Sequence, residues 1–252
     1  MNNGIKVLLI VLAVLFTLVL AGSSVLFMMK GKSILGASNK LVEEKTFENI
    51  QNIAVKTDVS DVYIQYSTDN NYKVEIYSDK AKTTTIDVEN DNLLVEFKEE
   101  NKFFFYGKTP RIFIYIPKTF ANNIKITSTT GDVIAADYEK ANFDISVTTG
   151  DISLGWVKNA DISCTTGDIT IQDIKEKFNI ITTTGDVRIQ NININEDSTI
   201  ATTTGDVRVV NNRSNVYVDA NTRTGDINLN DNNRHSDITL NVKTTTGDIN
   251  IG

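Results

Sequence analysis

The sequence has few of the residues that stabilise disulfide-rich or metal-dependent folds. Its only cysteine is Cys164, so no intramolecular disulfide can form and no C-x-x-C redox or zinc pattern exists. A chain of 252 residues can bury a stable core without such a staple. It contains two prolines and is rich in Thr, Ile, Val and Asn, a composition that favours strands and turns over helices.

Catalytic motifs are also lacking. The single histidine, His235, lies in a polar stretch with no local nucleophile, and the sequence contains no G-x-S-x-G or H-E-x-x-H pattern. We therefore expect no enzymatic activity, no cofactor and no bound metal.

Positive charge is scarce relative to negative charge. The formal net charge of −7 opposes binding to nucleic acids, which requires clustered Lys and Arg to displace counterions from phosphates. The same charge disfavours direct attachment to anionic lipids or acidic wall polymers, unless cations bridge the two.

Only one long hydrophobic run is present, from Val7 to Met29. As a helix, its 23 residues would cover roughly 34 Å at about 1.5 Å per residue, enough to cross a bilayer core. A cleaved signal peptide is the alternative, because Lys6 precedes the run and Ala21 could end a cleavage site. We predict a transmembrane anchor in residues 1–30, attached to the membrane by residues 7–29, and a polar linker in residues 31–49.

The second half of the chain is an internal repeat with the pattern T-T-G-D-[I/V]. The repeated glycines recur at intervals of 17 to 22 residues and use half of the 14 glycines in the chain. This concentration at one position indicates a backbone requirement, such as a positive φ in a tight turn. The repeated pairs are Gly131-Asp132, Gly150-Asp151, Gly167-Asp168, Gly185-Asp186, Gly205-Asp206, Gly225-Asp226 and Gly247-Asp248.

Apolar and polar residues alternate on both sides of each Gly-Asp pair. After the aspartate come pairs such as Ile169 and Ile171, and an apolar residue such as Ile180 stands five positions before each glycine. Each repeat is then strand, glycine turn, strand and variable turn, and stacked repeats bury one continuous core. The predicted fold is an all-β, single-stranded β-solenoid with about 17–22 residues per coil, preceded by the N-terminal transmembrane helix.

The solenoid is predicted to have two regions. Residues 121–252 are the regular coils, and residues 50–120 contain strand-like segments that resemble degenerate coils and a cap. Within the latter lies a run of four aromatic residues, which covers the end of the core or forms a contact patch for a partner or a membrane. These residues are Phe103, Phe104, Phe105 and Tyr106.

The repeated aspartates suggest two roles. Carboxylates stacked at about 4.8 Å repel one another by roughly 0.9 kcal/mol per neighbouring pair in water, so something must offset the repulsion. The favoured interpretation is structural, with each aspartate accepting hydrogen bonds from turn amides or threonine hydroxyls. The alternative is a calcium ladder, although calcium-binding β-rolls have a nine-residue repeat. Cys164 occupies a slot held by Ser, Thr or Val in other repeats, so we expect a small core residue.

The last coil is predicted to be an association surface or a weak point. The sequence ends at Gly252, directly after the strand 248–251, with no capping segment. A terminal coil exposes unpaired backbone groups beside apolar side chains. End-to-end self-association is therefore expected as one mode of partner binding.

The order of these features resembles a known family. A membrane segment, a strand ending in Ile116-Pro117 and serial T-T-G-D coils look like the putative adhesin family of bacterial envelope proteins, which includes LiaG-like proteins of unknown function. The resemblance covers residues from about 50 to the end. It implies a β-solenoid, an extracytoplasmic setting and no catalytic residues.

Orientation and function follow from the residues together with this resemblance. Lys30, Lys32 and Lys40 follow the apolar run, so the positive-inside rule alone favours a cytoplasmic C-terminus, but the resemblance favours a single-pass protein with its C-terminal domain outside. We expect a non-catalytic envelope protein that binds another protein or a wall component, in adhesion or envelope stress. A structural scaffold of a membrane complex is the alternative, and a carbohydrate-active β-helix enzyme is the least favoured.

Overall fold

The alternating pattern forms strands throughout the part of the chain that can be described. The computed structural model describes residues 40–78, 83–98, 109–230 and 232–252, and every regular element in these ranges is a β-strand. Residues Ser38–Gly252 form one compact unit. Because small β-branched residues alternate with polar ones, each strand presents one apolar side to the interior and one polar side to solvent.

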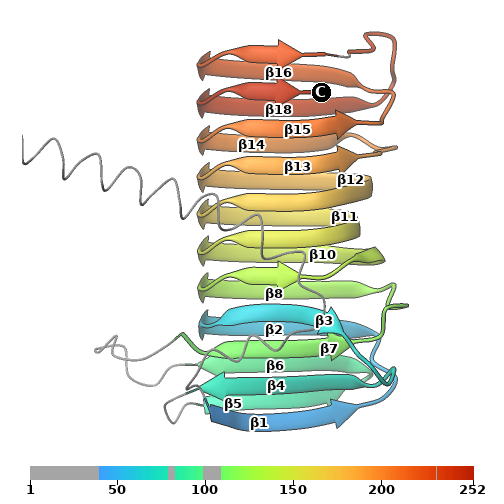
Figure 1. Ribbon diagram of the computed structural model, residues 1–252, viewed down its shortest axis with the longest axis vertical. Helices are drawn as coiled ribbons and strands as arrows, with labels where there is room; N and C mark the ends of the chain where they lie inside the picture. Colours follow the sequence, from blue (N-terminus) through green and yellow to red (C-terminus); the bar gives the residue numbers. More distant parts are fainter. Residues whose placement is uncertain (1–39, 79–82, 99–108, 231) are drawn as a thin grey trace, which may run out of the picture. The chain divides into compact units, whose positions relative to one another are not determined.

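The strands line two faces that are joined at two edges (Figure 1). The first face contains the strands that precede the glycine turns and, at the N-terminal end, three strands outside the repeat. In stacking order they are β5 (Thr83–Glu89), β6 (Asn92–Lys98), β2 (Asn52–Val59), β8 (Asn123–Thr130), the ends of β10 (Tyr138–Thr149), β11 (Ile152–Thr166) and β12 (Ile169–Thr184), then β14 (Ser198–Thr204), β18 (Thr239–Thr246) and β16 (Tyr217–Thr224).

The second face contains the strands that follow the glycine turns and, at the N-terminal end, four strands outside the repeat. Its stacking order is β1 (Lys40–Phe47), β4 (Tyr72–Ser78), β7 (Arg111–Ile116), β3 (Asp61–Tyr66), β9 (Val133–Ala135), the beginnings of β11 and β12, then β13 (Val187–Ile192), β15 (Val207–Asn212), β19 (Ile249–Ile251) and β17 (Ile227–Leu229).

Successive coils of the repeat pair in parallel and in register, so the predicted β-solenoid is confirmed. Ile145 pairs with Ile162, and Ile162 with Ile180. The glycine turns line up along one edge, on the left in Figure 1. The variable turns form the opposite edge, where insertions change the coil length without disturbing the strands.

The repeated glycines adopt the positive φ that the sequence analysis predicted. All seven repeated glycines have a positive φ, between 131° and 148°. A Cβ on Gly185 would lie 2.0 Å from the carbonyl oxygen of Gly167 in the neighbouring coil. Two constraints therefore exclude larger residues here, the backbone angle and the close approach of the next coil.

The core is a set of apolar columns, one side chain per coil. Ile126, Ile162, Ile180 and Ile200 are at most 1% exposed, as the alternation predicted. Cys164 is buried as well, which confirms that it is a core residue. Ile227 departs from the prediction because it is 41% exposed, and the reason is the position of its coil.

Stacking order differs from chain order at the C-terminal end. The last coil, β18–β19, lies between the β14–β15 coil and the β16–β17 coil. Gly205 N–H donates to Thr246 O and Gly247 N–H donates to Thr224 O, each at 2.9 Å. The prediction that the strand 248–251 forms the open end is therefore wrong. Among the described residues the outermost coil is β16–β17, so no further coil of this part of the chain covers Ile227.

Stacking order differs from chain order at the N-terminal end as well. The β2–β3 coil packs against β8–β9, while β6 and β7 pack on its outer side. A ladder of asparagine amides follows this stacking order rather than the chain order. Hydrogen bonds of 2.7 to 3.0 Å link successive members of the ladder, which are Asn92, Asn52, Asn123, Asn142 and Asn159.

The N-terminal region was predicted to contain a membrane anchor and a polar linker. The linker prediction is wrong for residues 40–47, which form β1 and pair antiparallel with β4. Most residues of β1 are exposed, so the sequence shows no alternation of buried apolar residues here. This edge strand is held mainly by backbone pairing. Within the described ranges no helix has the length and hydropathy of a membrane span. The predicted anchor, residues 7–29, lies outside the described residues.

The glycine turns give the first testable prediction. We expect Gly185→Val to lower the free energy of unfolding by about 3 kcal/mol or more, since backbone strain of about 1–3 kcal/mol adds to a clash with Gly167. Arg188→Val, on the outward side of the same coil, should change stability by about 0.5 kcal/mol or less. Urea denaturation of both variants measures this, and equal losses would contradict the turn assignment.

Candidate functional site

The repeated aspartates hold neighbouring coils together. Oδ1 of each repeated aspartate except Asp226, in the outermost coil, accepts a hydrogen bond from the backbone N–H of the aspartate in the adjacent coil, at 2.8 to 3.1 Å. The column begins at Asp61, whose carboxylate accepts from Asp132 N–H. These charge-assisted hydrogen bonds oppose the repulsion between stacked carboxylates, as the structural interpretation expects. Among the described residues, no group of three or more His, Cys, Asp or Glu could hold a metal ion.

Threonine hydroxyls add a second set of bonds across the glycine turns. The inward-facing Thr202, Thr222 and Thr244 each donate to a glycine carbonyl of the adjacent coil, at 3.0 to 3.3 Å. Cys164 takes this place in its own coil, with Sγ 3.6 Å from Gly150 O. Burial raises the pKa of its thiol. A protonated thiol in the core is a poor nucleophile, so the site candidates lie elsewhere.

The predicted aromatic contact patch belongs to a segment outside the described residues. Phe103, Phe104, Phe105 and Tyr106 lie outside the described residues, between the end of β6 and the start of β7. His235 is exposed and lies on a turn, where its backbone N–H donates to Asn233 Oδ1.

A group of side chains that the sequence analysis missed surrounds Glu75 on the outer side of the second face. The Glu75 carboxylate accepts hydrogen bonds from Lys73 Nζ at 2.6 Å, from Tyr77 OH at 3.0 Å and from Tyr115 OH at 3.2 Å. Burial raises the pKa of Glu75, but these hydrogen bonds outweigh it and hold the pKa below its usual value. Phe113 stacks nearby on Tyr63, with ring centroids 4.7 Å apart.

The side chains of this Glu75 cluster also contact one another through their rings and charges. Lys73 Nζ lies 4.6 Å from the centroid of Tyr115, and the Arg111 guanidinium carbon lies 5.9 Å from the centroid of Tyr77. The sequence of β7 contained a signal for this cluster, because Phe113 and Tyr115 alternate with buried isoleucines. Aromatic residues on the outward side of a strand usually pack against other side chains. We assign the cluster a structural role.

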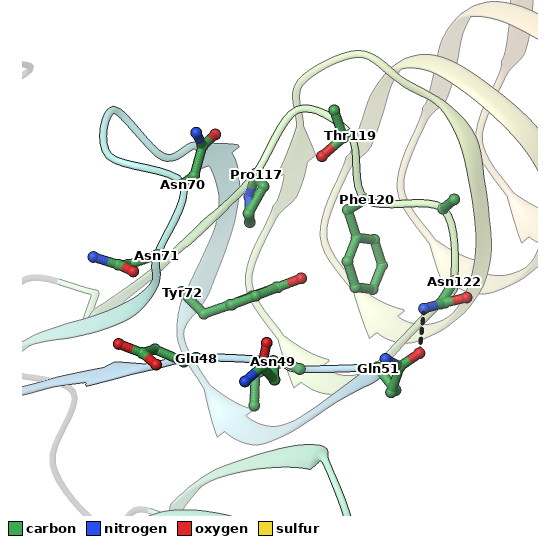
Figure 2. A pocket seen from close by; sticks show the side chains of 12 residues that line it. Glu48, Asn49, Gln51, Asn70, Asn71, Tyr72, Pro117, Thr119, Phe120 and Asn122 are labelled. Carbon is green, nitrogen blue, oxygen red and sulfur yellow. Dashed lines mark hydrogen bonds between the residues drawn. The ribbon is translucent and has the colours of Figure 1, made fainter.

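The other region missed by the sequence analysis is a cleft of about 500 Å3 at the edge opposite the glycine turns. Three connections that are distant in the sequence form it, namely the turns between β1 and β2, between β3 and β4, and between β7 and β8. Figure 2 shows the Tyr72 side chain extended across the cleft toward Phe120, with amide and carboxylate groups around it. The two rings meet edge to face, with centroids 6.2 Å apart.

Most of the polar lining of this cleft consists of uncharged amides. Asn49, Gln51, Asn70, Asn71 and Asn122 contribute amide groups, while Glu48 contributes the only charged side chain. Asn122 Nδ2 donates to Gln51 Oε1 at 3.0 Å, a bond that joins two of the three connections (Figure 2). Amide groups and a carboxylate beside an aromatic ring are suited to binding a polar ligand.

The pKa of Asp61 gives a prediction about pH. Burial raises this pKa above its ordinary value of 3.8, more than Asp132 N–H and Arg111 lower it. A raised folded-state pKa means that the native state holds the proton more tightly, so the contribution of Asp61 to stability is present below the unfolded-state pKa and is lost as pH rises through the folded-state pKa.

Asp61→Asn keeps an oxygen acceptor for Asp132 N–H but cannot ionise. We therefore expect the stability of this variant relative to the unsubstituted protein to increase as pH rises from about 3 to 7. Chemical denaturation across this range measures the difference. Asp69→Asn is the control, because hydrogen bonds from Ser67 and Asn71 lower the pKa of Asp69. The relative stability of this variant should therefore change with pH in the opposite direction. A pH-independent difference for Asp61→Asn would contradict the assignment.

Comparison with solved structures finds similar folds with little sequence identity. A putative adhesin from Bacteroides fragilis is 16% identical, with a TM-score of 0.50, and the match covers 85% of this chain and 98% of that one. A putative cell adhesion protein from Clostridium sporogenes is 13% identical, with a TM-score of 0.39, covering 83% and 98%. A putative adhesin from Parabacteroides distasonis is 12% identical, with a TM-score of 0.49, covering 84% and 98%.

At this level of identity the Bacteroides fragilis structure supports the fold alone. No curated protein matches the chain. The resemblance to the putative adhesin family that the T-T-G-D repeats predicted is confirmed. The model of the Toastrack DUF4097 family matches residues 50–252, and the chain therefore belongs to that family.

Proposed function

We propose that this protein is a non-catalytic binding module of the cell envelope that recognises another envelope protein or a wall component. The observation that carries the proposal is the cleft beside Tyr72, where three turns of a rigid solenoid bring amide groups and an aromatic ring together. Binding sites commonly combine an apolar surface with a few fixed polar groups on a rigid scaffold.

The proposal includes attachment to the membrane by residues 7–29, with the solenoid on the extracytoplasmic side. The uncharged run in this segment supports an anchor, because its length matches a bilayer core. The solved structures that share the fold are described as putative adhesins or a putative cell adhesion protein, which fits a role outside the cytoplasm.

Binding to the envelope is measurable with the full chain. Incubated with purified cell-wall sacculi or solubilised membrane proteins of the source organism, the protein should co-sediment or be captured in a saturable manner. A scaffold that only spaces other domains would bind neither fraction beyond the level of an unrelated protein of similar charge. Hydrolysis of the glycan during the incubation would support the carbohydrate-active alternative and contradict a non-catalytic role.

We also propose self-association as a second mode of partner binding. The contact surface that we propose is the β16–β17 coil and not the strand 248–251. Gly252 is already paired in the stack, because its N–H donates to Val209 O at 2.9 Å. In contrast, among the described residues no coil lies above Ile227 or the outer edges of β16 and β17, where the Asn232 side chain caps the backbone of Val218. An edge of this kind can pair with the same edge of a second copy.

We expect the full chain to form concentration-dependent dimers in sedimentation velocity and Ile227→Lys to shift them toward monomers, because the charge would be placed in the contact. Ile181→Lys is the matched control, since Ile181 is 47% exposed on the outward side of a central coil. A protein that stays monomeric at all concentrations, or equal effects of both substitutions, would contradict pairing at this end.

A further inference from the structure

The cleft beside Tyr72 contains several polar side chains that the protein itself does not use. Within the described ranges, the side chains of Glu48, Asn49, Asn70 and Thr119 form no hydrogen bond or ion pair, and neither does the Tyr72 hydroxyl. Figure 2 shows Glu48 and Asn70 at the rim of the cleft, with their polar ends directed away from the Tyr72 ring, and Asn49 closer to that ring. Polar groups that line a cleft and have no partner within the protein are available to a ligand.

The backbone that carries these groups is fixed. Asn49 and Asn70 have positive φ values of 58° and 63°, which asparagine tolerates better than most residues. Gln51 N–H donates to Asp91 O at 2.7 Å, and Asn71 N–H donates to Asp69 Oδ1 at 3.1 Å. A site with a preformed backbone loses little conformational entropy on binding.

The apolar part of the cleft includes one aromatic ring that a ligand can contact, that of Tyr72. Phe120 is 4% exposed and Ile50 is 2% exposed, so both form the floor beneath Tyr72. Tyr72 is half-buried and meets Phe120 edge to face, which leaves part of its own ring toward the cleft. Burial raises the pKa of Tyr72, so the phenol stays protonated and keeps a hydrogen-bond donor.

We propose that this cleft binds uncharged sugar residues of a glycan. A pyranose ring presents an apolar C–H side and a rim of hydroxyl groups, each of which donates and accepts a hydrogen bond. Tyr72 supplies a surface for the C–H side, while the amides of Asn49 and Asn70 and the carboxylate of Glu48 supply acceptors and donors for the rim. A cleft of about 500 Å3 has room for roughly one or two sugar rings.

The charges argue against the other ligand classes. The lining contains one carboxylate and no Lys, Arg or His, and the chain as a whole carries a net charge of −7. Phosphate-bearing polymers and polyuronates would be repelled. A peptide is less well matched, because the apolar residues of the cleft are largely buried in its floor and leave no deep pocket for an apolar side chain.

The inference rests on the proposed function, because it names the class of envelope component that the module recognises. The test uses the full chain in a detergent without a sugar headgroup, since a glycoside detergent would compete for the cleft. The probes are uncharged oligosaccharides, including oligomers of N-acetylglucosamine, together with a phosphate-bearing wall polymer and peptides from the wall. Binding is measured by isothermal titration and on immobilised probes.

We expect an uncharged oligosaccharide to bind and Tyr72→Ala to weaken its affinity at least tenfold. Asn49→Gly should also weaken binding, since glycine keeps the positive φ while removing the amide, and its melting temperature should stay close to that of the unsubstituted protein. Trp156→Ala is the control, because Trp156 is a 45% exposed aromatic residue outside the cleft. It should leave the affinity unchanged.

The outcomes separate this inference from the proposed function. Glycan binding that survives both cleft substitutions, or that depends on Trp156, would overturn the site. Cleft-dependent binding of the anionic polymer or a peptide would overturn the ligand class. Binding to intact envelope fractions without binding to any uncharged glycan would overturn this inference alone. Failure to bind any envelope fraction or probe would overturn both.

Discussion

The close stacking of glycine turns is the constraint on which the rest of the structure depends. At each repeated glycine, a Cβ would lie 2.0 to 2.2 Å from a backbone carbonyl oxygen of the adjacent coil. Adjacent coils can therefore approach to strand-pairing distance only where no side chain is present, and the hydrogen bonds from Asp N–H to the Asp Oδ1 of the next coil depend on that approach. The exception is Ser60, which occupies the glycine position of the β2–β3 coil without a positive φ. On its outer side the chain passes through Pro110 rather than another glycine turn.

The sequence predicted the parts of the fold that repeat. Gly-Asp pairs with apolar residues at fixed offsets predict the turn, the parallel register and the inward columns, because each property is local to one coil. Ile180 and Cys164 are buried for this reason. The stacking order at both ends was not predictable, since it depends on which coil pairs with which. The T-T-G-D pattern is nearly the same in the coils of Gly205, Gly225 and Gly247, so the pattern alone does not show that the last of them lies in the middle.

The cleft was missed for a related reason. Its residues are distant in the sequence, between Glu48 and Asn122, and none of its segments forms a recognised motif. Polar turns with Asn and Gln are ordinary connections when each is considered alone. Only the exchanged order of the coils at this end, together with the antiparallel pairing of β4 with β7 and of β1 with β4, brings the three turns together. The Glu75 cluster was harder still to recognise, because β4 and β7 are not consecutive in the chain.

The two edges of the solenoid are under different constraints, and this difference locates the site. At the glycine edge, backbone and aspartate hydrogen bonds link neighbouring turns, and threonine hydroxyls add bonds in some coils, so a substitution there weakens the stack. At the opposite edge, the variable turns accept insertions because the strands on both sides remain paired. Variation that creates a binding site without loss of stability is therefore confined to the opposite edge. It is most effective where neighbouring turns differ in length and leave space between them, as the turns around Tyr72 do.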